Sequence, residues 1–170
     1  DRPKEISDYL HHFIGEENKH MSLFGKFCST YIGKIYPSRL IEIPEEIEEN
    51  ERDFLFFEKV VIFEEIVDFY NLSNEERLQP LARSINEYHH NDEVRHLAFG
   101  RTITRELFTP LKEKWSEEKL KYIRGYVAAY IESTWKEYYN PYVYKDIGIK
   151  DSYPLFEKAW NSSKSKKRQP

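Results

Sequence analysis

Two segments of this chain each carry a glutamate and a histidine three residues apart, and this spacing is the strongest constraint on the fold. The segment YHHNDEVRHLAF contains Glu93 and His96, with His89 four residues before Glu93. The segment FIGEENKHMSLF contains Glu17 and His20. On helices of about 3.6 residues per turn, these offsets put the side chains of each set on one face. Helices that aim such pairs inward are how four-helix bundles hold two iron or manganese ions.

Prolines delimit the first two helices that the sequence predicts. One helix is expected from about residue 4 to residue 36, where Pro37 stops it, and the stretch PSRLIEIP that follows is predicted to be a linker. Pro44 suits the first turn of a second helix, expected from about residue 45 to residue 71. This second helix is apolar almost all round, which is typical of a helix buried inside a bundle.

The third predicted helix carries the longer of the two metal-ligand patterns. Ser73 followed by Glu76 is predicted to open it as a capping box. Pro80 then falls in the early turns, so it either kinks the helix or marks its true start. The helix is expected to end near Thr109 and Pro110.

The C-terminal third of the chain predicts one more long helix and a short one. Ser116 is a good N-cap for a fourth helix that runs to about Asn140, and YPLFEKAW is predicted to be a short docking helix. Residues 161–170 form a polar, basic tail that is expected to be disordered. The predicted fold class is therefore all-α: a four-helix up-and-down bundle with a short C-terminal helix, forming one domain over residues 1–160.

Composition excludes several classes of function. The 26 basic and 30 acidic residues give a net charge of −4, so no global field indicates nucleic acid or an anionic membrane as a partner. The sequence has no run of about 18 apolar residues, the length that would predict a membrane span. The single cysteine, Cys28, excludes an internal disulfide and agrees with a reducing, cytoplasmic location. Because the chain starts at Asp1 rather than at methionine, we expect a fragment or a processed form.

The second predicted helix is expected to supply another carboxylate to the centre. A carboxylate inside the apolar second helix is costly unless a metal or another partner neutralises it. Glu64 has apolar residues as its helical neighbours, whereas Glu65 lies on the same stripe as Glu58 and Asp68, which indicates a solvated edge. Glu64 is therefore the predicted ligand, with Glu65 as the alternative if the helix is rotated.

Several polar residues lie close to the two patterns in the sequence. Asp92 could hold an imidazole of another helix through a hydrogen bond, with a surface ion pair as the alternative. Glu16 is expected to be solvated, and Arg95 and Arg101 are expected to form ion pairs rather than to touch a substrate. His12 could approach the site, but a surface position is the preferred interpretation.

At these residues the chain resembles the diiron arylamine N-oxygenases, the p-aminobenzoate N-oxygenase family. The matching pieces are EENKHMSLF, FEEIVDFYN and HHNDEVRHLAFGR, which span roughly residues 16–101. Most ferritin-like diiron enzymes supply one Glu-x-x-His from the third of these pieces, whereas this family adds the preceding histidine. The resemblance implies six metal ligands: Glu17, His20, Glu64, His89, Glu93 and His96. The family has one more glutamate ligand on an upstream helix, and with only 16 residues before Glu17 that helix is expected to be absent from this sequence.

The resemblance also implies an activity. It implies a non-haem diiron oxygenase with two iron ions, or manganese in their place, and dioxygen as co-substrate. The substrate would be a small amine of the arylamine type, oxidised toward nitroso or nitro, with no catalytic residue beyond the metal ligands. An external electron donor and a homodimer are expected partners. A ferritin-like iron-binding protein and another diiron oxidase or hydroxylase stay open as alternatives, although three imidazoles argue against iron storage.

Overall fold

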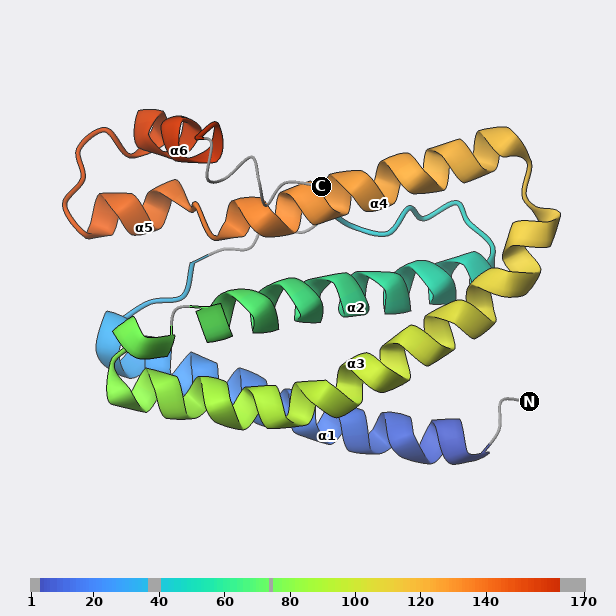
Figure 1. The fold of residues 1–170 in the computed structure, drawn as a ribbon, viewed down its shortest axis with the longest axis horizontal. Coiled ribbons are helices and arrows are strands. Elements are labelled where there is room, and N and C mark those ends of the chain that lie inside the picture. Colours follow the sequence, from blue (N-terminus) through green and yellow to red (C-terminus); the bar gives the residue numbers. More distant parts are fainter. Residues whose placement is uncertain (1–3, 37–40, 74, 163–170) are drawn as a thin grey trace. The chain divides into compact units, whose positions relative to one another are not determined.

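The computed structural model describes residues 4–36, 41–73 and 75–162. These residues form helices and no strand, which confirms the predicted all-α, ferritin-like class (Figure 1). Four of the helices are long: α1 (Lys4–Phe27), α2 (Glu49–Ser73), α3 (Pro80–Lys114) and α4 (Glu117–Glu137). Two short helices follow: α5 (Pro141–Asp146) and α6 (Ser152–Trp160). Within these ranges no helix has both the length and the apolar character needed to cross a membrane.

The first two helices are shorter than predicted. α1 ends at Phe27, and a single π-helical segment, Cys28–Ile32, continues it. Gly33 then closes the segment with a φ of 79°, a left-handed conformation that favours glycine, and its N–H bonds to the Cys28 carbonyl. α2 begins at Glu49 rather than directly after Pro44, so the proline does not start this helix.

The limits of α3 also differ from the prediction. Ser73 is the last residue of α2, and α3 begins only at Pro80, so the predicted capping box does not open α3. This start decides between the two interpretations of that proline. A proline at the first helical position loses no hydrogen bond. α3 passes through Pro110 and ends at Lys114. Leu111, just beyond this proline, is buried, and the packing that it gains offsets the hydrogen bond that Pro110 cannot donate.

The C-terminal elements follow the sequence signals more closely. Ser116 caps α4 as predicted, because its hydroxyl oxygen accepts a hydrogen bond from the Lys119 N–H at 3.2 Å. The predicted short helix is present as α6, and α5, which the sequence analysis did not predict, packs beside it. Asn140 caps α5 with its side chain, and Pro141 takes the first helical position. Most of the predicted basic tail lies outside the described residues.

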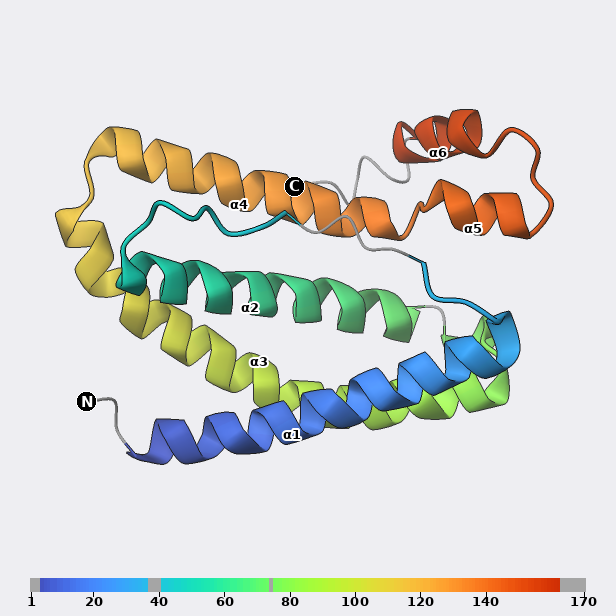
Figure 2. The same ribbon diagram turned by 180° about the vertical axis from the view of Figure 1, so that it is seen from behind.

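Contacts divide the chain into two compact units. The first comprises Asp1–Ile35 and Val67–Phe99, and the second comprises Tyr36–Ile66 and Gly100–Pro170. Both α2 and α3 therefore contribute a part to each unit. In the first unit, α1 lies alongside the N-terminal part of α3, as the two opposite views agree (Figures 1 and 2). This pairing puts the two segments with Glu-x-x-His on neighbouring helices.

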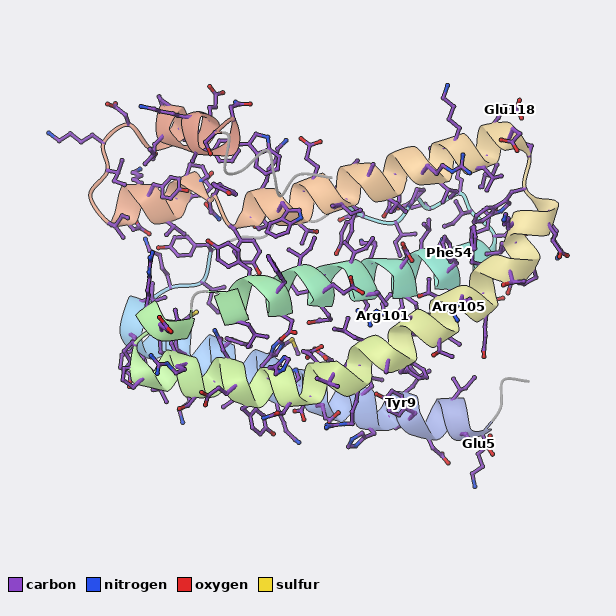
Figure 3. All side chains as sticks on the ribbon, viewed as in Figure 1. Glu5, Tyr9, Phe54, Arg101, Arg105 and Glu118 are labelled. Carbon is purple, nitrogen blue, oxygen red and sulfur yellow. The ribbon has the colours of Figure 1, made fainter. Side chains whose placement is uncertain are left out.

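The second unit holds a core of large apolar side chains. Its fully packed members are Phe54, Leu55, Leu111 and Ile123. Phe54, labelled in Figure 3, stacks on Phe108 with ring centroids 5.5 Å apart and meets the edge of Trp115 at 5.7 Å. Glu51 is buried beside this cluster, where it accepts hydrogen bonds from the Trp115 indole at 2.6 Å and the Lys119 ammonium at 2.8 Å. These contacts tie α2 and α4 together with the end of α3.

A glycine allows α2 and α3 to approach closely within the second unit. A Cβ at Gly100 would lie 2.6 Å from Cγ2 of Val61, and a β-branched side chain has little freedom to move away. We expect Gly100→Ala to lower the free energy of unfolding by about 1–3 kcal/mol, measured by urea denaturation. Gly125→Ala in α4 is the control: its Cβ meets nothing within 4 Å, so we expect a neutral effect or up to about 1 kcal/mol of stabilisation. Equal effects of the two substitutions would contradict the close approach.

Candidate metal centre

Five of the six predicted ligands lie in the first unit, on two helices. Glu17 and His20 come from α1, and His89, Glu93 and His96 come from α3. One ligand atom from each of Glu17, His20, Glu93 and His96 lies within 4.8 Å of the others, so this group could hold a metal ion. The helical spacing read from the sequence therefore does bring the two Glu-x-x-His pairs face to face.

Glu93 is at the centre of this cluster. Its Oε1 lies 3.3 Å from Nδ1 of His96 and 3.4 Å from Nδ1 of His20. The same oxygen lies 3.3 Å from Nε2 of His89. Glu17 completes the group, with Oε1 2.9 Å from Nδ1 of His96. Bonds of about 2.1 Å to an octahedral metal ion would put neighbouring ligand atoms about 3 Å apart, so these separations suit a shared cation.

The cluster is buried, and its inward-facing atoms lack hydrogen bonds. Glu93 is 0% exposed, and His20 and His96 are each 3% exposed. Among the described residues, no hydrogen-bond partner is found for either Glu93 carboxylate oxygen, for Glu17 Oε1, or for Nδ1 of His20 and His96. Some of these atoms approach within 3 Å, but without the alignment of a hydrogen bond. A buried carboxylate in this state is costly, and a cation among these donors would satisfy all of them.

The outer nitrogens of two imidazoles do have hydrogen-bond partners. Nε2 of His20 lies 3.1 Å from Oδ2 of Asp92, and Nε2 of His96 lies 2.9 Å from Oε2 of Glu16. A proton on Nε2 leaves the lone pair of Nδ1 directed toward the centre, as a metal ligand requires. The predicted hydrogen bond of Asp92 to an imidazole of another helix is confirmed, and Asp92 also forms an ion pair with Arg95. The prediction that Glu16 is solvated is wrong, because α1 lies along α3 and the Glu16 side chain is 6% exposed between His96 and Arg95.

Comparison with known proteins agrees with this geometry. The family model for the p-aminobenzoate N-oxygenase AurF matches residues 1–169. The chain belongs to this family. The match covers the second unit as well, well beyond the segments that suggested the resemblance, and it makes the protein a member of an oxygenase family. Neither a curated protein nor a solved structure matches the chain.

Aromatic rings cover the cluster from α1. The edge of Phe13 faces His96 with ring centroids 4.5 Å apart, and Phe24 faces His89 at 5.3 Å. Both phenylalanines lie on the same helical face as the two α1 ligands, one turn before and one turn after them. Their spacing was a signal that the sequence analysis did not use. In this AurF-family chain, these rings pack against two of the imidazoles of the cluster.

The remaining polar residues divide between the surface and the second unit. The preferred surface position of His12 is confirmed: its side chain is 60% exposed and lies 3.2 Å from Glu16. Glu65 forms an ion pair with Arg101 at 2.7 Å, and its side chain is 45% exposed, which confirms its solvated position. The rest of the predicted solvated edge is less exposed: the Asp68 side chain is 15% exposed and pairs with His90. Glu64 is buried and belongs to the second unit, so its role as a ligand stays a prediction.

The pKa values of His96 and His89 are shifted in opposite directions. Burial alone would lower the pKa of His96, but the surrounding carboxylates, Glu17 foremost, outweigh burial and raise the pKa to about 10. Burial lowers the pKa of His89, and nearby Glu93 only partly offsets this. Burial would raise the pKa of Glu17, but the adjacent His96 imidazole keeps the pKa of this carboxyl below its usual value. Near neutral pH the metal-free cluster therefore has a protonated His96 and a neutral His89.

Metal binding should therefore depend on pH. Because His96 is protonated below about pH 10 in the metal-free protein, a metal ion must displace that proton. His89 is already neutral and releases none. We expect the apparent affinity for Fe²⁺ to rise about tenfold per pH unit between pH 7 and 9, measured by anaerobic titration. An affinity that does not change over this range would contradict the raised pKa of His96.

Proposed function

We propose that this protein is a non-haem diiron oxygenase that uses dioxygen to oxidise the nitrogen of an arylamine. The observation that carries the proposal is Glu93, a fully buried carboxylate whose oxygens lack hydrogen-bond partners among the described residues and face three imidazoles. The AurF-family match supplies the reaction class.

Six side chains would hold the metal ions. The proposed ligands are Glu17, His20, Glu64, His89, Glu93 and His96. Carboxylates suit hard cations and can bridge two of them, and imidazoles suit iron as neutral donors. Iron is the proposed metal, with manganese as the alternative. The central position of Glu93 within the first unit suits a carboxylate shared between two ions.

The bound metal ions would supply the activation of dioxygen, and the protein supplies position and shielding. Asp92 and Glu16 accept the Nε2 protons of His20 and His96, which fixes the orientation of both rings. Phe13 and Phe24 exclude water from the donor atoms on the α1 side. Insertion of one oxygen atom from dioxygen requires two further electrons, so we propose an external electron donor. A homodimer and a cytoplasmic location stay predictions.

Two other functions fit the same family of folds. A protein that stores iron would favour carboxylates, whereas three imidazoles surround Glu93 here. A diiron hydroxylase acting on carbon would use a similar ligand set, so only the product distinguishes it from an N-oxygenase.

Metal content and product analysis test the proposal together. We expect about two iron ions per chain in protein purified from iron-replete cells, measured by elemental analysis. With an arylamine, a chemical reductant and ¹⁸O₂, mass spectrometry should find labelled hydroxylamine, nitroso or nitro product. Protein without iron would contradict the metal centre. If ¹⁸O is found on a ring carbon instead, the metal centre would stand, but the reaction would be hydroxylation of carbon rather than oxidation of nitrogen.

A further inference from the structure

Arg95 connects the two carboxylates that hold imidazoles of the candidate metal centre. Its Nη2 lies 2.6 Å from Oε1 of Glu16 and 2.7 Å from Oδ1 of Asp92. Its Nη1 donates a hydrogen bond to the backbone carbonyl of Asn91 at 3.1 Å, which fixes the guanidinium against its own helix. One cation thus bridges an acidic residue of α1 and an acidic residue of α3.

Each of these carboxylates has its other oxygen on an imidazole of the opposite helix. Glu16 of α1 contacts His96 of α3, and Asp92 of α3 contacts His20 of α1. The contacts form a chain of five side chains, His20–Asp92–Arg95–Glu16–His96, that crosses three times between the helices. A substitution of Arg95 therefore affects the hydrogen bonds of both imidazoles.

The charges in this chain require a cation in the middle. Glu16 is 4% exposed and Asp92 is 8% exposed, so their mutual repulsion is poorly screened by water. Among the described residues, Arg95 is the one cation that forms an ion pair with both of them. Ion pairs between fully exposed residues contribute little to stability. Here both acidic partners are buried, so removing the guanidinium would leave two buried carboxylates without their cation.

We propose that Arg95 is a positioning residue of the metal centre. By holding Asp92 and Glu16 in place, it fixes the rotation of the His20 and His96 rings and so directs their Nδ1 atoms at the ions. The inference rests on the proposed function, because it presumes that these nitrogens bind metal. Without the guanidinium, the two carboxylates separate, and each imidazole loses the acceptor that orients it.

Cobalt(II) titration of the metal-free full chain tests this role, because bound cobalt reports its ligands through visible absorption. We expect Arg95→Ala to weaken cobalt binding by about 10–100-fold and to alter the absorption bands. Arg101→Ala is the matched control. Arg101 lies on the same helix, is similarly exposed, and has one ion-pair partner, Glu65 at 2.7 Å, outside the cluster. We expect it to leave affinity and spectrum unchanged. Arg95→Lys, which keeps a cation on a flexible stem, should recover part of the affinity.

The outcomes separate this inference from the proposed function. If wild-type protein binds no cobalt, the metal centre itself is wrong, and the role of Arg95 with it. If wild-type protein binds cobalt and Arg95→Ala matches Arg101→Ala in affinity and spectrum, the positioning role alone is overturned. Circular dichroism of each metal-free variant verifies its fold. Should Arg95→Ala not fold, Arg95→Gln keeps most of the side-chain length without the charge, and the same loss of affinity is expected of it.

Discussion

Replacing His89, Glu93 and His96 together by Leu, Gln and Leu should remove all bound iron and abolish oxygenase activity. The same change should lower the free energy of unfolding of the metal-free protein. The reason is that Glu16 and Glu17 remain in place but lose His96, whose pKa they help to raise to about 10. Removing one partner of a buried ion pair costs about 3–5 kcal/mol, and the loss of the buried Glu93 carboxylate offsets part of this cost. Elemental analysis and urea denaturation in the presence of a chelator measure the two effects.

His90 offers the control for this experiment. It lies next to His89 in the sequence, and its Nδ1 pairs with Oδ1 of Asp68 at 2.8 Å. We expect His90→Leu to retain the full iron content. A triple variant that still binds two iron ions would show that other residues hold them. A metal-free triple variant as stable as wild type would contradict the ion pairs of a protonated His96 with Glu16 and Glu17.

The sequence predicts those features of the centre that depend on the spacing of residues within a single helix. The spacing of Glu17 and His20, and of Glu93 and His96, puts each pair on one face whatever the helices pack against. The Ser116 cap was predictable for the same reason, because the N-cap contact lies within four residues. Ser73 has a similar pattern with Glu76, yet α2 extends through it. A capping signal competes with the continuation of the preceding helix, and the sequence alone does not show which of the two prevails.

The parts that the sequence did not predict depend on two helices at once. Glu16 was expected to be solvated. It is buried because Arg95 and His96 of α3 reach its side of the helix, and that contact depends on how far α1 is shifted along α3. The bridging role of Arg95 is hidden for the same reason. An ion pair was predicted for it, but its two partners come from different helices.

Glu64 and its neighbour Glu65 provide the second test, because they differ in position and not in chemistry. We expect Glu64→Gln to weaken the binding of at least one iron ion by more than about 100-fold, beyond the 10–100-fold typical of residues that only support ligands. Activity should fall at least as far. Glu65→Gln should retain both ions, because Glu65 is paired with Arg101 at an exposed edge of α2. Such a pair contributes about 0–1 kcal/mol to stability.

Iron content, iron affinity and turnover of the two variants decide which glutamate belongs to the centre. Loss of iron in Glu65→Gln with normal iron in Glu64→Gln would mean that α2 presents the other face to the metal ions and that the Arg101 pair breaks when they bind. Normal iron in both variants would mean that neither Glu64 nor Glu65 is a ligand. The centre would then consist of the residues that α1 and α3 bring together, and Glu93 would be its main carboxylate. Loss of iron in Glu64→Gln alone would add a third helix to the centre.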